Sequence, residues 1–468
     1  METVQTALDS GLRRNDGLPR DSWSPTAAPP PPVGTTLRIA CHTLGCKLNY
    51  SETCTIEREF RSRGYRPVPF GQPAEVTVIN SCTVTAQAES KCRAAIRKAR
   101  QASPDGFVIV TGCYAQLRPG EIAALAGVDA VLGHQEKFRL FELLERFDRG
   151  PAPQIAVSCT GALQRFDAAF GGGGRTRAFL KIQDGCDYKC SFCTIPRARG
   201  PSRSQPLDAT VARAREIAAQ GYKEIVLTGV NIGLYGRGHG QSLADLLRAL
   251  DRVEGIKRLR VSSIEPNLLS DELIDRIADS DKIVAHFHLP LQSGDDQVLW
   301  RMRRLYRKGH YAGRIERILR RLPDACIGAD VIVGFPGEDR PSFANTVAFL
   351  SSLPLAYLHV FSYSERPGTD ASDGREPLGE GVPRDERRRR SALLRRLSDQ
   401  KRATFYRRQS GSARTVLWEW PRPDGRSYGL TDNYVQVVAV DGERPRGSLE
   451  TVRLIRLTAE GLVEACSL

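Results

Sequence analysis

Cys186-Asp187-Tyr188-Lys189-Cys190-Ser191-Phe192-Cys193 places three cysteines in one short stretch, with three and then two residues between them. The chain has 12 cysteines in 468 residues, so chance would produce this spacing with a probability on the order of one in a hundred. A loop of this length can direct its sulfur atoms at one small inorganic centre. We therefore interpret these cysteines as metal ligands.

The number of ligands distinguishes two kinds of metal site. A structural zinc site needs four ligands and is usually closed by a second Cys or His pair at a short distance. No histidine lies between His134 and His239, and the nearest other cysteine, Cys159, is separated from the loop by the glycines at 171–174. Three thiolates suit a four-iron cluster in which one iron stays open to a reactant.

With Phe192 before its last cysteine, the pattern Cys-x-x-x-Cys-x-aromatic-Cys resembles the signature of the radical S-adenosylmethionine superfamily. The resemblance implies that Cys186, Cys190 and Cys193 hold a 4Fe-4S cluster whose open iron chelates S-adenosylmethionine through its amino and carboxylate groups. It also implies that an electron from this cluster cleaves S-adenosylmethionine to a 5′-deoxyadenosyl radical.

Composition limits the partner and the compartment. Lysine and arginine outnumber aspartate and glutamate by 68 to 54, and the net charge of +14 favours a polyanionic partner, nucleic acid first and a membrane surface second. No apolar run approaches the roughly 18 residues of a spanning helix, and no secretory signal is recognisable, so we expect a cytoplasmic protein. In a reducing compartment, clustered cysteines indicate metal ligands or catalytic thiols rather than disulfides.

The N-terminal third divides into a leader and a strand-helix unit. Residues 1–36 are rich in Pro, Ser, Asp and Arg without apolar periodicity, which predicts a disordered leader. From residue 37, apolar runs alternate with amphipathic stretches, and this alternation predicts a parallel α/β sheet domain over 37–160. The expected strands are 37–43, 75–80 and 107–111, and the expected helices are 51–64, 86–101 and 119–126.

Cys46, Cys82 and Cys113 each lie just after one of these strands. The carboxyl ends of parallel strands share one edge of a sheet, where ligands bind, so the three thiols should converge although they are far apart in sequence. This trio predicts a second three-thiolate cluster. The alternative is that buried cysteines act as small apolar residues, as we expect for Cys41. We interpret the remaining cysteines as structural: Cys54, Cys92, Cys159, Cys326 and Cys466.

The segments around this trio carry a more specific resemblance. They are Thr43-Leu44-Gly45-Cys46-Lys47-Leu48-Asn49-Tyr50-Ser51-Glu52-Thr53, Asn80-Ser81-Cys82-Thr83-Val84-Thr85 and Gly112-Cys113-Tyr114-Ala115-Gln116. They are similar to the N-terminal domain of the methylthiotransferases, radical enzymes with two iron-sulfur clusters. The resemblance covers the chain from residue 37 onward and implies that Cys46, Cys82 and Cys113 hold the first 4Fe-4S cluster.

A second strand-helix unit is expected at 176–408, after a glycine-rich linker at 161–175. Six strand-helix units are too few to close an eight-stranded barrel, so we expect a partial (β/α)6 barrel with its chemistry at the carboxyl ends of the strands. The strand candidates are 178–183, 224–228, 259–263, 283–289, 327–333 and 357–362, and helices are expected at 208–220, 243–253 and 343–350.

Polar or glycine-bearing turns follow these strands. The resemblance implies contacts to S-adenosylmethionine at Gly229, Asn231, Glu265, Gln292 and Ser293. The alternative is that such residues only provide turn geometry. The basic segment 302–306 resembles a family motif but is equally consistent with a solvated helix end.

The C-terminal part has two candidate RNA-binding features. The arginine-rich, amphipathic stretch 384–408 includes Arg402 and Arg407 and predicts a helix that binds RNA phosphates or anionic lipid, or one that packs on the barrel with a solvated outer face. Residues 409–468 predict a small β-barrel that resembles the TRAM domain, which holds RNA in these enzymes. Its aromatic candidates are Trp418, Trp420, Tyr428 and Tyr434.

The function implied by the resemblance is tRNA methylthiotransferase. One molecule of S-adenosylmethionine serves as radical source to remove an adenine hydrogen, and another methylates the sulfur that the first cluster delivers. The stretch 45–53 is most similar to the class acting on N6-threonylcarbamoyladenosine beside the anticodon. Classes acting on isopentenyladenosine or on a ribosomal-protein aspartate are the alternatives.

The implied partners are tRNA, a reductant of flavodoxin or ferredoxin type and a sulfur source. No membrane partner is expected, and a monomer is compatible with the sequence. A hypothesis of a different class is a non-catalytic iron-sulfur or zinc protein that binds nucleic acid. Such a protein would need closed, four-ligand metal sites.

Overall fold

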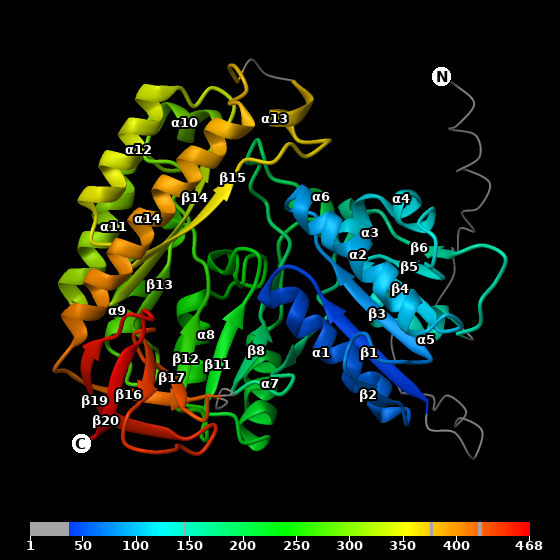
Figure 1. Cartoon of the computed structure of the whole chain (residues 1–468), viewed down its shortest axis with the longest axis horizontal. Helices are drawn as coiled ribbons and strands as arrows, with labels where there is room; N and C mark the ends of the chain where they lie inside the picture. The colour runs from blue at the N-terminus through cyan, green and yellow to red at the C-terminus, as the bar shows by residue number, and fades with distance from the viewer. Residues whose placement is uncertain (1–36, 145–146, 375–377, 420–423) are drawn as a thin grey trace.

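The computed structural model describes residues 37–144, 147–374, 378–419 and 424–468. The predicted leader and Trp420 lie outside these residues. Figure 1 shows three units packed together, which are an N-terminal sheet, a central barrel of strands and helices, and a small C-terminal β-barrel. This arrangement confirms the predicted α/β fold class.

The N-terminal unit is a parallel sheet with the order β2-β1-β3-β4-β5-β6. Helices α1 (Lys47–Ser62) and α2 (Ala86–Ala102) cover its two faces. Every residue of β3 and β4 is therefore buried, which explains why both read as nearly continuous apolar runs. The strands are β1 (Arg38–Thr43), β2 (Arg66–Val68), β3 (Val76–Ser81), β4 (Phe107–Gly112), β5 (Ala130–Leu132) and β6 (Gln154–Ala156).

The register of this sheet aligns the carboxyl ends of β1, β3 and β4. Asn80 of β3 pairs with Thr43 of β1 and with Thr111 of β4. The loops that follow the three strands therefore start side by side, as the sequence predicted.

The chain enters the barrel through the predicted linker. β7 (Phe170–Gly171) pairs antiparallel with β8 (Arg177–Lys181), so the start of the glycine run belongs to the barrel sheet. A Cβ atom on Gly171 would stand 2.5 Å from Cβ of Cys54, so the glycine allows β7 to lie against α1. The domain boundaries themselves stay predictions.

The central unit is an open arc of parallel strands in the order β8, β11, β12, β13, β14 and β15. Isolated bridges, such as Ser263 with His288, join β12 to β13. Within the described ranges, β15 does not pair back to β8, which confirms the partial barrel. The strands after β8 are β11 (Glu224–Thr228), β12 (Arg258–Val261), β13 (His286–His288), β14 (Cys326–Val333) and β15 (Tyr357–Ser362).

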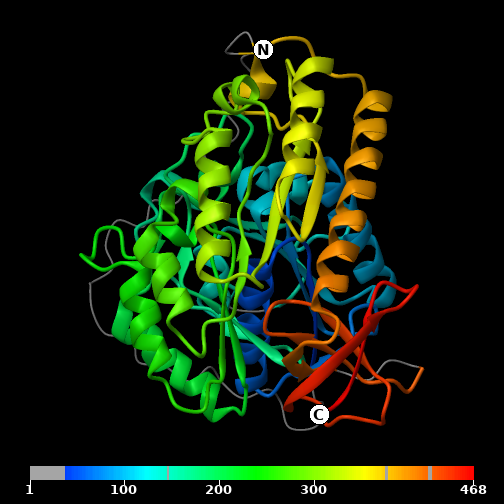
Figure 2. The ribbon, with the colours of Figure 1, turned by 90° about the vertical axis from the view of Figure 1, so that its left-hand side faces the viewer.

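Helices cover the outside of this arc and share one apolar core with its strands (Figure 2). They are α7 (Leu207–Ala219), α8 (Leu243–Asp251), α9 (Asp271–Ala278), α10 (Asp296–Arg301), α11 (Lys308–Arg321) and α12 (Arg340–Ser352). The long helix α14 (Arg384–Gln409) lies along β15, where Leu394 is fully buried and the Ser398 hydroxyl bonds to the backbone of Leu358. The predicted arginine-rich stretch is thus a helix packed on the barrel.

The C-terminal unit is a closed barrel with the order β16-β17-β18-β20-β19. It packs on the amino ends of the central strands, where Arg258, the first residue of β12, donates to the carbonyl of Leu430 at 3.1 Å. Within the described residues, no helix is both long and apolar enough to cross a membrane. The strands are β16 (Ala413–Trp418), β17 (Tyr428–Thr431), β18 (Gln436–Ala439), β19 (Leu449–Leu457) and β20 (Val463–Ser467).

Candidate functional site

Cys186, Cys190 and Cys193, which we call the second trio, lie in the loop after β9 (Gln183–Asp184), beyond the carboxyl end of β8. The N–H of Cys193 donates to the carbonyl of Cys190 at 3.1 Å, which folds the loop back on itself. The N–H of Ser191 donates to the carbonyl of Met302. The loop is therefore held by its own turn and by a neighbouring segment.

The pKa values of the second trio reflect its burial. Burial, with a smaller contribution from the neighbouring thiols, raises the pKa of Cys186 to about 11 and that of Cys193 to about 12. At Cys190 burial also raises the pKa, and Arg304 opposes it by donating from Nη1 to Sγ at 3.2 Å. A bound metal supplies the positive charge that buried thiolates need, so the trio is suited to a metal centre.

Cys46, Cys82 and Cys113, which we call the first trio, lie at the carboxyl edge of the N-terminal sheet. Cys46 is the N-cap residue of α1, Cys82 follows β3, and Cys113 begins α3 (Cys113–Leu117). Gly45 has a φ of +97°, and a Cβ atom there would stand 2.9 Å from Sγ of Cys82. The loops of Cys46 and Cys82 thus touch, and glycine leaves the room for the thiol.

The thiols of the first trio also affect one another. Burial raises the pKa of Cys82 to about 12, and the proximity of Cys113 and Cys46 adds to this effect. Burial raises the pKa of Cys113 as well, and the charge of Arg199 opposes it. Each trio therefore consists of three thiols close to one another with an arginine beside them.

A buried group of charged residues connects the first trio to the barrel, and we call it the ionic network. Its members are Glu52, Lys137, Lys181, Asp184 and Arg199, whose side chains are at most 3% exposed. Glu52 lies 2.6 Å from Nζ of Lys137 and 3.0 Å from Nη1 of Arg199. Buried charges are tolerated only when they are paired, so the network holds the N-terminal unit against the barrel.

The pKa of Glu52 shows that the attraction of its cationic partners outweighs the effect of burial. Burial by itself would raise the pKa of Glu52, but Arg199, Lys137 and Lys181 outweigh burial and hold that pKa well below its usual range. The carboxylate is therefore charged at neutral pH.

Helix α6 (Ile195–Arg199) connects the two trios. It begins two residues after Cys193 and ends with Arg199, whose Nη2 donates to Oδ1 of Asn49 at 2.6 Å. The Asn49 amide in turn donates to the carbonyl of Ser81, the residue before Cys82. One helical turn thus relates the loop of the second trio to the loops of the first.

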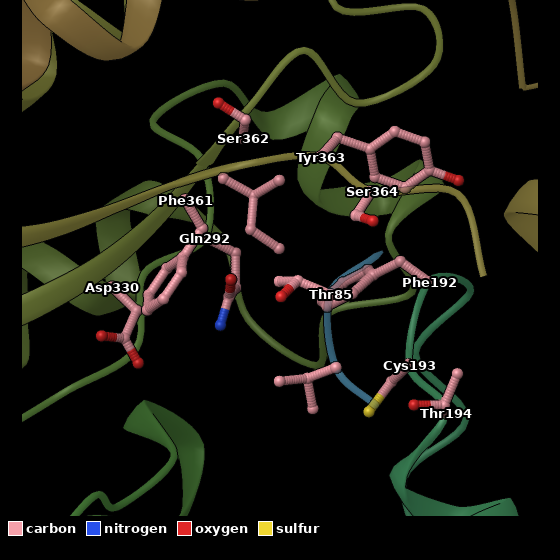
Figure 3. A pocket seen from close by; sticks show the side chains of 12 residues that line it. Thr85, Phe192, Cys193, Thr194, Gln292, Asp330, Phe361, Ser362, Tyr363 and Ser364 are labelled. Carbon is pink, nitrogen blue, oxygen red and sulfur yellow. The ribbon is translucent and has the colours of Figure 1, made fainter. Parts of the chain in front are cut away.

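A cavity of about 220 Å³ borders the loops of both trios (Figure 3). Val84 and Thr85, which follow Cys82, form one part of its wall, and Phe192, Cys193 and Thr194 form another. An apolar cavity with a few polar groups is typical of a small-ligand site. The barrel contributes the rest of the lining, which is Gln292, Asp330, Ile332, Phe361, Ser362, Tyr363 and Ser364.

Two of the residues predicted to contact S-adenosylmethionine lie in the turn after β11. Gly229 packs against Gln183, whose Oε1 accepts the N–H groups of Val230 and Asn231. Asn231 is 4% exposed and its side chain lies beside Cys186, where it lowers the pKa of that thiol, and among the described residues no hydrogen-bond partner reaches its amide oxygen. The buried amide of Asn231 is therefore suited to a polar ligand at the second trio.

The other three predicted contacts differ in their surroundings. Glu265 pairs with Arg304 at the second trio. Gln292 has a φ of +69° and lines the cavity. Ser293 is fully buried, and its hydroxyl accepts the N–H of Asp295 at 3.2 Å. Glu265 and Gln292 thus lie at the trio or its cavity, whereas the Ser293 hydroxyl serves the turn before α10.

The residues predicted to bind RNA divide into exposed arginines and packed aromatic rings. Arg402 and Arg407 are exposed on α14. Trp418 is fully buried in the C-terminal barrel. Tyr434 stacks on His286, with ring centroids 4.2 Å apart. In this structure both aromatic rings stabilise the small barrel and its contact with the central strands, because a unit of this size needs large side chains to fill its core.

His288, Asp330 and His359 form a further group whose ligand atoms all lie within 4.8 Å of one another. Both histidines use the same oxygen, Oδ1 of Asp330, at 2.9 and 3.1 Å. The second ring nitrogen of His288, Nδ1, forms a hydrogen bond with the hydroxyl of Ser263. These hydrogen bonds already satisfy the group, and we assign no metal to it.

Comparisons with known proteins agree with this geometry. The model of the Radical SAM superfamily matches residues 180–350, which contain the second trio, and the model of Uncharacterized protein family UPF0004 matches residues 38–133, which contain the first. The threonylcarbamoyladenosine tRNA methylthiotransferase MtaB of Bacillus subtilis is 39% identical over 89% of this chain and 94% of its own length. The chain belongs to the radical SAM methylthiotransferases.

Other relatives in this family are also similar over much of the chain. MtaB of Aquifex aeolicus is 36% identical over 90% of this chain and 100% of its own. A tRNA-2-methylthio-N(6)-dimethylallyladenosine synthase of Parafrankia is 36% identical over 71% of this chain and 68% of its own. The solved radical S-adenosylmethionine methyltransferase TsrM of Kitasatospora setae has a TM-score of 0.54 at 15% identity, covering 72% of this chain and 75% of its own, so it shares the fold.

Family membership implies S-adenosylmethionine and two 4Fe-4S clusters as cofactors. The residues present fit them, because each trio offers three neighbouring thiols and the amide oxygen of Asn231 beside the second trio has no protein partner among the described residues. The six cysteines are our proposed ligands.

The sequence analysis missed the ionic network and the role of Arg304. Arg304 falls in the segment 302–306 that resembles a family motif, so a signal existed for it. Glu52 also falls in a stretch that carries the family resemblance, 43–53, but Lys137 and Arg199 offered no such signal, because a charged residue reads the same in a sequence whether it is exposed or buried and paired.

Proposed function

We propose that this chain converts N6-threonylcarbamoyladenosine in tRNA to its 2-methylthio derivative. Three relatives named for this tRNA modification are 35–39% identical over 89–92% of the chain. The clusters and S-adenosylmethionine, when bound, supply the radical and sulfur chemistry that no side chain can perform at an adenine C–H bond. The chain itself contributes binding, orientation and separation from water.

The observation that carries the proposal is the cavity that borders the loops of both trios. A nucleobase placed there would lie between Val84 and Thr85, which belong to the loop after Cys82, and the loop of Cys193. A reaction that first removes hydrogen from one carbon and then adds sulfur to it requires that carbon to reach two centres. Proximity of this kind is a large part of what proteins contribute to such reactions.

The cavity lining is suited to a planar base. The rings of Phe192, Phe361 and Tyr363 offer apolar faces, and Phe361 is 46% exposed although it is large. Unpaired bases stack on such rings when proteins recognise single-stranded RNA. The amide of Gln292 offers a hydrogen-bond donor and an acceptor to the edge of the base (Figure 3).

The test is mass spectrometry of tRNA nucleosides from cells that lack the gene. We expect 2-methylthio-N6-threonylcarbamoyladenosine to disappear, to return with the wild-type gene, and to stay absent with Cys82→Ala or Cys193→Ala. Unchanged levels in the deletion strain would reject the proposal.

A second candidate substrate is the isopentenyl (dimethylallyl) form of adenosine, because a relative named for that base is 36% identical over 71% of this chain. The same nucleoside measurement decides, since the 2-methylthio form of that base would then disappear instead. The non-catalytic alternative predicts one or two zinc ions per chain after anaerobic purification, whereas the enzyme predicts about eight irons. The flavodoxin or ferredoxin reductant and the sulfur source stay predictions.

A further inference from the structure

A second cavity, of about 190 Å³, adjoins the cavity of about 220 Å³ that we propose to receive the base. Thr194 lines both cavities, and Thr83 of the second precedes Val84 of the first in the loop after Cys82. The second cavity therefore also borders the loops of both trios. Its lining is Thr83, Leu117, Arg118, Thr194, Arg197, Arg366, Pro367 and Gly368.

Three guanidinium groups reach this cavity from separate segments. Arg118 follows α3, Arg197 lies in α6, and Arg366 lies in the chain after β15. Their carboxylate partners are Glu89, which is 2.7 Å from Arg366 and 3.7 Å from Arg118, and Glu121, which is 3.2 Å from Arg118. The two carboxylates thus pair with Arg118 and Arg366, and neither of them pairs with Arg197.

Arg197 is therefore the guanidinium that lacks a carboxylate partner. Within the ranges that the structure describes, no carboxylate stands at ion-pair distance from it, and its guanidinium makes one hydrogen bond, from Nη1 to the carbonyl of Pro367 at 3.0 Å. Gly368, with a φ of +86°, lies so close that a Cβ atom there would overlap the guanidinium. The loop therefore holds Arg197 in place while most of its five N–H donors stay available.

A fixed, incompletely paired guanidinium is the group that proteins use to bind carboxylates and phosphates, because its planar donors match two oxygens at once. Glu89 is 5% exposed and already paired with Arg366, so a ligand need not displace it to reach Arg197. The anion must also lie within reach of a base in the adjoining cavity.

We propose that the arginine-lined cavity binds an anionic oxygen group of the RNA substrate. Two sources share this chemistry, which are the carboxylate of the threonylcarbamoyl substituent and a backbone phosphate next to the modified base. The inference rests on the proposed function, since it assumes that the neighbouring cavity receives the base.

The experiment measures binding of two anticodon stem-loop RNAs to the anaerobically reconstituted enzyme without reductant, by fluorescence anisotropy. One RNA carries N6-threonylcarbamoyladenosine and the other carries adenosine at that position. The variants are Arg197→Gln, which removes the exposed guanidinium, and Arg197→Lys, which keeps the charge without the planar fork. Arg61→Gln is the matched control, because Arg61 is 58% exposed on α1 and pairs only at the surface with Glu57.

We expect Arg197→Gln to weaken binding of the modified RNA by about ten-fold or more, as loss of a hydrogen bond to a charged group does. Arg197→Lys should recover part of that loss. If the ligand is the carboxylate, binding of the adenosine RNA stays unchanged in both variants. If the ligand is a phosphate, both RNAs lose affinity equally. The negative slope of log affinity against log salt concentration then decreases in magnitude by about 0.7.

The inference is overturned if Arg197→Gln binds both RNAs as Arg61→Gln does. Iron content and circular dichroism equal to those of the wild type verify that the variant is folded and loaded. Wild-type turnover of the modified RNA separates this result from failure of the proposed function. If the wild-type enzyme forms the methylthio product and Arg197→Gln binds both RNAs normally, only the assignment of this cavity is rejected. If wild-type enzyme that carries its clusters and cleaves S-adenosylmethionine forms no methylthio product, the proposed function is rejected.

Discussion

The second trio comes from one loop of eight residues, whereas the first trio comes from three loops that only the parallel sheet brings together. Spacing in the sequence therefore defines the second trio, and strand order defines the first. A group of three neighbouring thiols can thus be formed either by one local loop or by long-range packing. The local one needs few supporting contacts, while the distributed one depends on the packing of a whole domain.

The electrostatic surroundings differ in the same way. At the second trio, Arg304 bonds to Cys190 and pairs with Glu265, which is a small, local arrangement. At the first trio, Arg199 belongs to the ionic network, whose members come from both the N-terminal unit and the barrel. Damage to the network should therefore affect the docking of the two units, and damage at Arg304 should stay local.

Removing a ligand from the second trio should have the largest effect. With Cys190→Ala, iron should fall from about eight to about four per chain, and both 5′-deoxyadenosine and the methylthio product should disappear. Iron assay and liquid chromatography of the reaction mixture measure these changes. Cys159→Ala, at an exposed cysteine, is the control and should keep full iron and activity. Persistent 5′-deoxyadenosine in Cys190→Ala would contradict the assignment of this trio.

Removing a ligand from the first trio should distinguish the activities of the two centres. Cys82→Ala should lose the same share of iron, about four atoms, and the methylthio product, but it should still cleave S-adenosylmethionine to 5′-deoxyadenosine. The reason is that the second loop has its own supports and does not need the first. Loss of both activities in folded Cys82→Ala protein would show that the two trios are not independent.

Breaking the ionic network should destabilise the docking of the N-terminal unit. Glu52→Gln leaves Lys137 and Arg199 short of a buried partner, and removing one member of a buried ion pair costs about 3–5 kcal/mol. The free energy of unfolding from urea titrations measures the change. Glu57→Gln, which breaks the exposed pair with Arg61, is the control and should cost about 0.3–0.5 kcal/mol. Equal costs for both variants would mean that the network is not stabilising.

Acid should weaken the same region in two steps. Burial, with the nearby Lys137, holds the pKa of His134 well below its usual range, so below about pH 6.5 the unfolded chain binds a proton that the folded chain does not. Stability should fall there by up to about 1.4 kcal/mol per pH unit for this group. Glu52, whose pKa is held low, contributes stability that is present above about pH 4.5 and is lost as the pH falls further.

Urea titrations at several pH values measure this dependence. His134→Gln should flatten the upper step and leave the lower one. His286, whose pKa burial also lowers, keeps part of the upper step in that variant. An unchanged slope between about pH 5 and pH 6.5 would contradict the account of His134.

The fold was largely predictable where apolar runs are long. The strands predicted at 107–111 and 357–362 match β4 and β15, because both runs are rich in β-branched or aromatic residues, although only β4 is buried along its whole length. The stretch 283–289 was predicted as one strand, but only His286–His288 forms β13, and Ile283 makes an isolated bridge with Leu259. Helix α6 was not predicted, since five residues with a proline show no periodicity.

The candidate site was predictable to the extent that cysteine positions reveal it. The spacing of the second trio and the strand-end positions of the first were visible in the sequence. The burial of Trp418 was not, because an aromatic residue in a small β-barrel is equally suited to a core and to an RNA-binding face. The cavities were also hidden, since their walls combine residues as distant as Val84 and Ser364.

The sequence by itself determined the type of chemistry, because three thiols in one short loop constrain the metal centre through covalent chain geometry alone. It also determined the parallel sheet, because alternating apolar runs and amphipathic stretches bury their surfaces in few other ways. Only the tertiary structure decided which charges are buried together and which loops border one cavity. Such contacts depend on the docking of separate units, and no local pattern of residues encodes the distance between them.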